Sequence, residues 1–351
     1  MKGKKILFSL VAMLTIGVLA GCSSANNTSG SSNTTGSKPL DTVRIAYFPN
    51  ITHSQALVGM QNGQFQKDLG STKIEWKQFN AGPSEIEAFL SGAVDIGYIG
   101  PGPAINGYTK SKGDLQIIAG ATDAGAVLIG KKDSAIKSVK DLSGKKVAIP
   151  QFGNTQDLCL RFLLQENGLK DTTKGGTVQI VQADNPDIVS LLDKGSIDAA
   201  LVPEPWGATI QAKSGASIIL DYNQIWKQGK YSTAVVVARK EFIKDHPDVV
   251  EKFLKTHVEL TDYLNKSQTE ASTKVNDELN TLTKKPLDKS VLDTAFKRLT
   301  VTVNPETEAT KEMIDMSVKA GFIKEKPDDK GLFDLTILNK VLKAKGEKTI
   351  N

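Results

Sequence analysis

The sequence predicts an α/β protein made of two lobes with a ligand-binding cleft between them, and three observations lead to this fold class. About 310 residues have ordinary globular composition, which is more than one hydrophobic core usually supports. Short apolar runs alternate with segments of helical periodicity, as they do in α/β sheets. Residues 86–103 also resemble residues 188–206, which indicates two lobes built on one plan.

The first 22 residues have the order of a bacterial lipoprotein export signal. A basic run at 2–5 precedes an uncharged, largely apolar run at 6–19, and Ala20-Gly21-Cys22 follows. Because the apolar run is shorter than the ~20 residues that cross a bilayer, we expect a cleaved signal peptide over residues 1–21. In the lipoproteins that this segment resembles the cysteine is acylated, which implies a lipid anchor at Cys22 on the extracytoplasmic face of the cell membrane.

The next segment and the charge of the chain say little about partners. Residues 22–40 are mostly Ser, Asn, Thr and Gly, a composition typical of a flexible tether. The net charge is +5, and removing Lys2, Lys4 and Lys5 with the leader leaves +2, so nucleic acid is not indicated as a partner. Once Cys22 is acylated only Cys159 remains, which excludes a disulfide framework and a cysteine-based metal site.

The internal repeat gives the order of elements within each lobe. In each copy a helix ends at a glycine, a turn follows at an aspartate, and a short apolar strand leads into a proline-rich loop. The glycines are Gly92 and Gly195, and the aspartates are Asp95 and Asp198, so the offset is 195 − 92 = 198 − 95 = 103. A weaker echo precedes each copy, where strands at 43–47 and 147–149 run into polar loops and then helices.

These elements define the lobes. We expect mostly parallel sheets, a first lobe over 41–131, a second lobe over 132–232, and a return to the first lobe over 233–351, where the C-terminal helices pack on its outside. Ligands in such folds bind at the carboxyl ends of the strands. The loops near 48–55, 100–104, 151–156 and 203–206 should therefore converge on one cleft.

The expected cleft loops carry polar side chains but no Arg or Lys, namely Asn50, Thr52, His53, Ser54, Gln151, Asn154, Thr155 and Gln156. Helices should begin at 52–54 and 153–156, and the free N–H groups of a helix N-terminus bind anions without a cationic side chain. The pattern favours a small, weakly basic anion as ligand. An equally good interpretation of each residue alone is that it caps its helix.

Three further residues are candidates with competing interpretations. His53 is the one histidine in a predicted cleft loop and could contact ligand or simply cap a helix. For Glu204 a structural role in its loop is favoured over ligand contact, and Trp206 could line an apolar wall or pack between lobes. No nucleophile with an adjacent base, phosphate loop or metal-spaced histidine pair is found, so we expect neither an enzyme nor a cofactor.

The segments 43–59, 84–103, 141–164 and 188–206, in this order behind a lipoprotein leader, resemble the substrate-binding proteins of ABC importers for aliphatic sulfonates, taurine and nitrate. The most specific segments are Asp141-Leu142-Ser143-Gly144-Lys145-Lys146-Val147-Ala148 and Pro203-Glu204-Pro205-Trp206. The resemblance implies a monomeric two-lobe fold of the periplasmic-binding-protein type II, which closes on an oxyanion and delivers it to a permease and, through it, an ATPase.

The resemblance also implies where the ligand is held. The family's ligand-contacting regions correspond to the loop at 50–53, to Pro101 and Gly102, and to Gln151, Gly153, Asn154, Thr155 and Gln156. One departure is Gly153-Asn154-Thr155-Gln156-Asp157, where family members often carry a Ser-Thr or Thr-Ala pair. We expect an aliphatic sulfonate or taurine as ligand, with nitrate as an alternative.

Two related classes share the fold. Enzymes that make the thiamine pyrimidine need a cysteine-rich stretch and a pyridoxal-phosphate lysine, and the chain has no cysteine cluster. Binding proteins for thiamine-pyrimidine precursors are the nearer alternative, because they share the fold, the leader and the importer. Such proteins would be expected to offer stacking aromatic residues. The predicted cleft loops contain four aromatic residues that could stack on a heterocycle, Phe48, Tyr98, Phe152 and Trp206.

Overall fold

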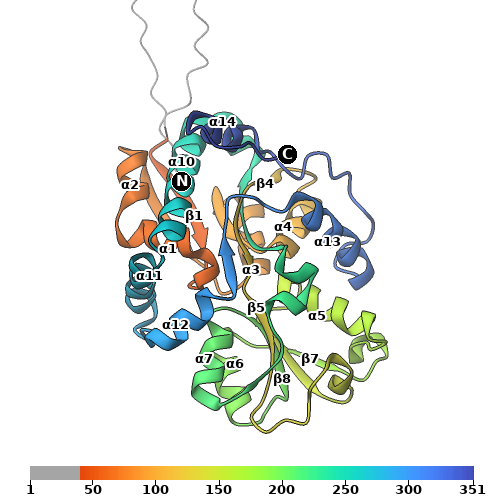
Figure 1. The fold of residues 1–351 in the computed structure, drawn as a ribbon. Coiled ribbons are helices and arrows are strands. Elements are labelled where there is room, and N and C mark those ends of the chain that lie inside the picture. Colours follow the sequence, from red (N-terminus) through yellow and green to blue (C-terminus); the bar gives the residue numbers. More distant parts are fainter. Residues whose placement is uncertain (1–39) are drawn as a thin grey trace, which may run out of the picture. The chain divides into compact units, whose positions relative to one another are not determined.

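The computed structural model describes residues 40–351, shown in Figure 1. The predicted signal peptide, Cys22 and all of the predicted tether except Leu40 lie outside the described residues. The described part contains two sheets with helices around them, which confirms the prediction of a two-lobe α/β fold.

The sheet of the first lobe has six strands in the order β11-β4-β10-β3-β1-β2. Strand β1 lies between β2 and β3 and is parallel to both, whereas β10 is antiparallel to β3 and β4, and β11 is antiparallel to β4. The strands are β1 Thr42–Tyr47, β2 Lys73–Gln78, β3 Ile96–Ile99, β4 Leu115–Ala124, β10 Ser232–Arg239 and β11 Leu299–Val301.

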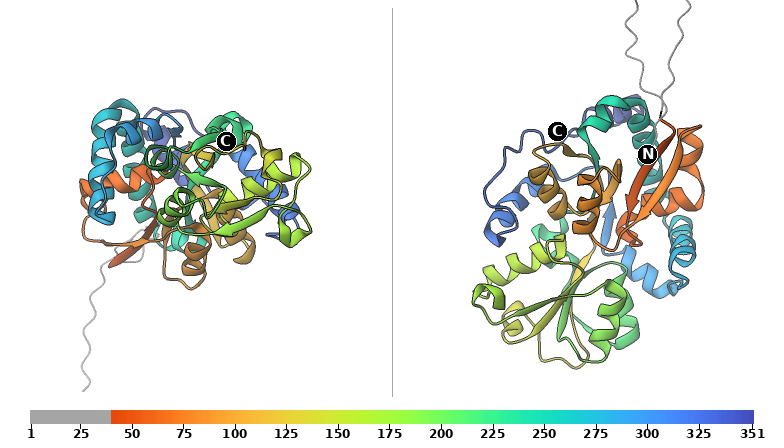
Figure 2. Two further views of the ribbon diagram at one scale, coloured as in Figure 1. Left: turned by 90° about the horizontal axis from the view of Figure 1, so that it is seen from below. Right: turned by 180° about the vertical axis from the view of Figure 1, so that it is seen from behind.

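The sheet of the second lobe has five strands in the order β7-β6-β8-β5-β9. Strand β6 is parallel to β7 and β8, and β5 is antiparallel to β8 and β9. The strands are β5 Ala126–Gly130, β6 Lys146–Ile149, β7 Gln179–Gln182, β8 Ala199–Pro203 and β9 Ser217–Leu220. In Figure 2 the sheet lies between α5 on one side and α6 and α7 on the other.

Two sequence expectations differ from this topology. Both sheets are mixed rather than mostly parallel. Strand β10 returns from the second lobe and runs antiparallel to its neighbour β3, and β5 arrives from the first lobe and runs antiparallel to its neighbour β8. The chain changes sheets at Gly125, so β5 belongs to the second sheet although the expected second lobe began at 132. The return strand β10 begins at Ser232, next to the expected boundary at 232/233.

Helices cover both sheets and alternate with the strands along the chain. The helices before the return strand are α1 Ser54–Gln61, α2 Gln64–Leu69, α3 Gly82–Leu90, α4 Pro101–Lys110, α5 Thr155–Glu166, α6 Asn185–Asp193, α7 Trp206–Ser214 and α8 Tyr222–Ile225. After it come α9 Lys240–Asp245, α10 Pro247–Lys266, α11 Gln268–Thr283, α12 Lys289–Phe296, α13 Thr307–Ala320 and α14 Thr336–Ala344. Short 3₁₀ helices lie at Ile51–His53, Val139–Leu142, Thr172–Lys174 and Lys227–Gly229.

The C-terminal helices do more than cover the first lobe. Helices α10 and α14 pack on its outside, whereas α12 also contacts α7 and α13 contacts α5, both in the second lobe. One hydrophobic cluster accordingly includes Ile105 of α4, Leu160 of α5 and Met313 of α13. The two lobes thus share part of their buried apolar core. Among residues 40–351 no helix is both long and apolar enough to span a membrane.

The internal repeat corresponds to a repeat of structure. In the first lobe Ile45 of β1 pairs with Ile96 of β3, and in the second lobe Val147 of β6 pairs with Ala199 of β8. Ile45 corresponds to Val147 at an offset of 147 − 45 = 102, and Ile96 corresponds to Ala199 at an offset of 199 − 96 = 103. Gly92 and Gly195 both have positive φ, +74° and +68°, where a side chain would be strained. Each sheet therefore has the same local order, β2-β1-β3-β10 in one and β7-β6-β8-β5 in the other.

Candidate functional site

A cavity of about 30 Å³ lies between the two sheets, at the carboxyl ends of the parallel strands. By the same measure one water molecule needs about 10–15 Å³, so the cavity has room for a group of a few atoms. It is lined by Phe48, Asn50, Thr52, His53, Asn80, Ala81, Gly82, Gly100, Pro103, Pro150, Asn154, Thr155, Gln156, Asn185, Pro203 and Thr233. None of these residues is Lys, Arg, Asp or Glu.

Five helices begin at this cavity. In the first lobe they are α1, with the 3₁₀ turn before it, α3 and α4, and in the second lobe α5 and α6. The first N–H groups of a helix have no partner within the helix, and the aligned peptide dipoles place about half a positive charge at each N-terminus. Helix α4 contributes its dipole only, because Pro101 and Pro103 have no N–H and the Gly102 N–H is bonded to Thr155. The cavity is therefore electropositive without any cationic side chain.

His53 lines the cavity as a neutral donor rather than a cation. Its side chain is buried, its Nδ1 accepts a hydrogen bond from the Phe48 N–H at 3.0 Å, and its ring stacks on Phe48 with centroids 4.5 Å apart. Burial lowers the pKa of the imidazole to about 3. Because Nδ1 is the acceptor, the single proton of the neutral ring lies on Nε2.

The start of α5 is held rigid by reciprocal hydrogen bonds. Asn154 Oδ1 accepts from the Asp157 N–H at 2.8 Å, and Asp157 Oδ2 accepts from the Gly153 N–H at 2.8 Å, where φ is +82°. Burial raises the pKa of Asp157, an effect that Arg161 opposes through an ion pair at 2.8 Å. The Asn154 side chain therefore caps the helix in addition to lining the cavity.

Three hydrogen bonds join the lobes around the cavity. The Gly102 N–H donates to Thr155 Oγ1 at 3.2 Å, Trp206 Nε1 donates to Asn50 Oδ1 at 2.8 Å, and Asn80 Nδ2 donates to Asp184 Oδ2 at 3.0 Å. The contact at α4 is so close that a Cβ atom on Gly100 would lie 2.3 Å from Thr155 Oγ1. The structure thus shows a closed arrangement of the lobes.

Comparison with known proteins places this geometry in a family. Residues 36–276, more than half of the chain, match the NMT1-like family. The chain belongs to this family of ABC-importer substrate-binding proteins, which includes sulfonate, taurine and nitrate binders.

The names of individual relatives agree with this family. The chain is 28% identical to a putative aliphatic sulfonates-binding protein of Bacillus subtilis (strain 168), over 97% of both chains. It is 30% identical to the taurine-binding periplasmic protein of Escherichia coli (strain K12) over 219 residues, and the match spans 62% of this chain and 64% of that protein. Among solved structures, the periplasmic nitrate-binding protein from Synechocystis PCC 6803 superposes with a TM-score of 0.74 at 14% identity, covering 88% of this chain and 90% of that one.

Half of the residues predicted for the site line the cavity of this NMT1-like protein, namely Asn50, Thr52, His53, Asn154, Thr155 and Gln156. Pro101 and Gly102 form the first turn of α4, and Gly102 is held to the second lobe by its N–H. Gln151 lines a neighbouring space of about 260 Å³, together with Asn80 and Asp184. Gly153 positions the start of α5 through its bond to Asp157.

The last two predicted residues, Glu204 and Trp206, also lie outside the cavity lining. Glu204 is fully buried and accepts hydrogen bonds from Arg298 Nη1 at 2.7 Å and from the Ala208 N–H at 2.9 Å, which is the structural role that the sequence favoured. Burial raises the pKa of Glu204, and these two donors oppose the effect. Trp206 faces a separate groove and bonds to Asn50 across the lobes.

Sequence reasoning missed the contribution of two loops. Asn80, Ala81 and Gly82 follow β2, and Asn185 follows β7, and all four line the cavity. A signal was present, since Pro83 and Pro186 stand 186 − 83 = 103 residues apart at the starts of α3 and α6, in register with the repeat. Among residues 40–351 no group of three or more His, Cys, Asp or Glu is placed to hold a metal ion.

Proposed function

We propose that the protein is the extracytoplasmic binding component of an ABC importer and captures a small oxyanion, an aliphatic sulfonate or taurine, for the permease and its ATPase. The names of the relatives support this class of ligand. The observation that carries the proposal is the convergence of five helix N-termini on a cavity whose lining has no charged side chain at neutral pH.

The chemistry of the cavity suits a weakly basic oxyanion. Each helix N-terminus contributes about 0.3–1 kcal/mol to holding an anion, and more where the site is partly buried. Peptide N–H groups, neutral His53 and the amide and hydroxyl side chains can each donate to one oxygen of a sulfonate. Since no carboxylate lines the cavity, an anion meets no like charge there.

The mechanism that we propose is capture by closure. Ligand bridges helix N-termini from both lobes, so it stabilises the closed arrangement over an open ligand-free form. The bonds from Gly102 to Thr155 and from Trp206 to Asn50 add to the closed form because each joins the two lobes. The permease would then recognise the closed protein through surfaces that flank the cleft.

The aromatic residues favour an oxyanion over a thiamine-pyrimidine precursor. Of Phe48, Tyr98, Phe152 and Trp206, only Phe48 lines the cavity, and one face of its ring is covered by His53. Tyr98 is fully buried and bonds to His257, while Phe152 is 48% exposed. Nitrate stays an alternative, because the cavity alone would suit it.

We propose binding rather than catalysis. Cys159, the free thiol of the described chain, is 2% exposed, and burial raises its pKa to about 12. The thiol therefore stays protonated and packs in the core, which does not support a nucleophile. Our proposal also includes cleavage after residue 21, acylation of Cys22, a tether over 22–40 and a monomeric protein.

Calorimetric titration of the chain from residue 22, with Cys22→Ser in place of the acylated cysteine, tests the ligand. We expect ethanesulfonate or taurine to bind and thiamine-pyrimidine precursors not to bind. At 100 times its dissociation constant a ligand adds about 2.7 kcal/mol to stability, so melting temperature gives a second readout. Binding of a pyrimidine precursor with no response to any sulfonate would overturn the proposal. Binding of nitrate alone would identify nitrate, rather than a sulfonate, as the ligand.

A further inference from the structure

A second, larger space lies beside the cavity, with a volume of about 550 Å³. It runs between α6 and α7 of the second lobe and the corner formed by α11 and α12. We call it the tail groove and define it by its apolar residues Val189, Trp206, Leu279, Leu282, Leu287 and Val291. The last four lie beyond the segment that matches the family.

The tail groove adjoins the cavity. Asn50, Asn80 and Asn185 line both spaces, so they form a shared wall. A molecule whose head is held at the helix N-termini can extend past these three side chains into the tail groove. The cavity, at about 30 Å³, has room only for the head of such a molecule.

Two buried polar atoms at the tail groove have no hydrogen-bond partner within the described chain. They are Oδ1 of Asn185 and Oγ1 of Thr209, in residues that are 5% and 6% exposed. Asn185 lines both spaces and Thr209 lines the tail groove. Both oxygens are closed off from the groove itself, and a hydrocarbon tail offers no hydrogen bond to either. The case for a ligand tail therefore rests on the apolar lining of the groove and on its continuity with the cavity.

Charges in the tail groove balance. Lys213 and Lys285 are offset by Asp193 and Asp288, and the remaining lining is apolar or neutral. The groove therefore does not select a charged tail. Its apolar residues instead favour carbon atoms that leave water on binding.

We propose that the tail groove binds the organic tail of a sulfonate whose SO₃⁻ group occupies the cavity. The preferred ligands are then sulfonates with a tail of several carbon atoms, rather than taurine or an inorganic anion. This inference rests on the proposed function, and it adds which part of the ligand determines affinity. The residues that determine specificity are those of α6, α7, α11 and α12 around the groove.

A series of alkanesulfonates tests the inference by calorimetry, with ethane-, butane-, hexane- and octanesulfonate as probes. Full burial of one methylene strengthens binding by up to about fourfold. We expect affinity to rise with each added methylene until the groove is filled. Equal or falling affinity from ethanesulfonate to octanesulfonate would overturn the tail groove and leave the proposed function standing, whereas failure of every sulfonate to bind would overturn both.

A variant on the wall of the tail groove distinguishes burial of the alkyl tail in the groove from nonspecific hydrophobic binding of long alkyl chains elsewhere on the protein. Ser190 is exposed on α6 and lines the groove, so Ser190→Trp places an indole in it without disturbing the core. We expect the ratio of octanesulfonate to ethanesulfonate affinity to fall toward one. The matched control is Asp187→Trp, because Asp187 is exposed on the same helix and does not line the groove. A ratio that stays high in Ser190→Trp, or that falls equally in both variants, would contradict the inference.

Discussion

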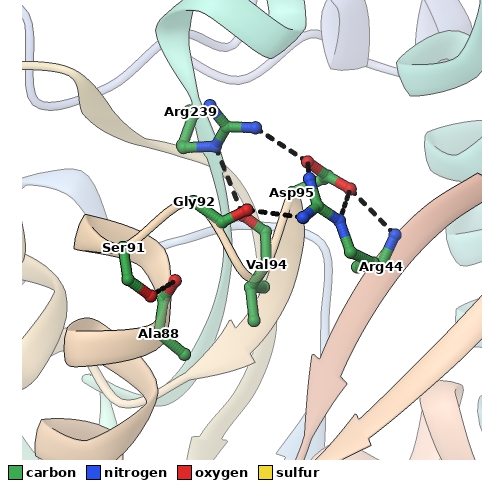
Figure 3. A network of polar contacts seen from close by, with 7 residues as sticks. All are labelled: Arg44, Ala88, Ser91, Gly92, Val94, Asp95 and Arg239. Atoms are coloured by element: carbon green, nitrogen blue, oxygen red, sulfur yellow. Dashed lines mark hydrogen bonds and ion pairs between the residues drawn. The ribbon is translucent and has the colours of Figure 1, made fainter. Parts of the chain in front are cut away.

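Asp95 and Asp198 occupy the same place in the repeat of the two lobes, and their surroundings differ. Each accepts a hydrogen bond from the neighbouring strand, Asp95 from the Arg44 N–H at 2.9 Å and Asp198 from the Lys146 N–H at 3.0 Å. The Asp95 side chain is 2% exposed and binds two arginines, as Figure 3 shows, whereas Asp198 is 23% exposed and binds Lys131.

The part of the motif that both lobes share is the part that the fold requires. The bond to the strand N–H is common to both lobes, and it fixes the turn that leads into β3 or β8 and thus to the cleft. The charged partners vary with burial. In the first lobe Arg239 ends β10 and α9 follows at once, so that carboxylate is covered and needs two guanidinium groups.

The largest effect should come from removing the covered carboxylate. Asp95→Asn leaves Arg44 and Arg239 without their counter-charge at a buried position, and we expect a loss of about 3 kcal/mol in the free energy of unfolding. Asp198→Asn removes a partly exposed contact and should cost only about 1 kcal/mol. Urea unfolding of the two variants without ligand measures both values. Asn keeps an oxygen that can accept the strand N–H, so the losses report the charged partners alone, and equal losses would show that burial and the second arginine add nothing at Asp95.

A third aspartate, Asp123, has a pKa that is shifted in the opposite direction from those of Asp95 and Asp198. Burial on its own would raise the pKa of Asp95 and Asp198, but hydrogen bonds from their cationic partners bring the net shift below the usual value. Asp123, at the end of β4, is 8% exposed and accepts from Ser232 Oγ at 2.9 Å. Burial raises its pKa to about 7, and Glu306 adds to the effect.

Asp123 changes the stability with pH in the opposite direction from Asp95 and Asp198. Between its unfolded pKa of about 3.9 and its folded value, Asp123 binds a proton only in the folded state, so stability falls as pH rises through this window. The contributions of Asp95 and Asp198 are fully present above pH ~4 and are lost on further acidification. Asp123→Asn should therefore gain stability relative to the parent from pH 4 to 7, by on the order of 1 kcal/mol per pH unit.

Urea unfolding at pH 4, 5, 6 and 7 checks this expectation, with Asp198→Asn as the control. The contribution of Asp198 is nearly constant in that range, so its difference from the parent should stay flat. His53 and His257, with pKa values lowered to about 3 and 4 by burial, make stability rise with pH in the same window. They are present in every protein compared and cancel. A flat difference for Asp123→Asn would show that its carboxylate is ionised in the folded protein.

The two-lobe fold and half of the candidate site could be predicted because their signals are local or periodic. The repeat, with its glycine and aspartate at an offset of 103, locates equivalent turns in the two lobes. The rule that ligands bind at strand carboxyl ends then selects Asn50, His53 and Asn154. These residues follow parallel strands directly, so no knowledge of distant contacts is needed.

The remaining features depend on contacts between distant segments. Glu204 finds its partner Arg298 at a separation of 94 residues, and nothing in the sequence near either residue indicates the pair. The direction in which β10 and β5 enter their sheets is equally invisible in a short apolar run, which is why the sheets were expected to be mostly parallel. The tail groove also needs α11 and α12 to reach the second lobe.

The smallest effect we predict concerns the helix starts that the two lobes present to the cavity. Asn154 caps α5 through the Asp157 N–H, whereas Asn50 has no side-chain bond to its own helix and instead accepts from Trp206 in the other lobe. Asn154→Ala should therefore lower the stability of the ligand-free protein by about 1 kcal/mol.

Asn50→Ala is the matched comparison. Its bond forms only when the lobes are closed, so we expect a smaller loss of stability without ligand and a loss of sulfonate affinity of up to about tenfold, the equivalent of one hydrogen bond. Thermal unfolding with and without ethanesulfonate separates the two quantities. If Asn50→Ala lost as much ligand-free stability as Asn154→Ala, the closed arrangement would already dominate before ligand binds, and capture would not depend on closure.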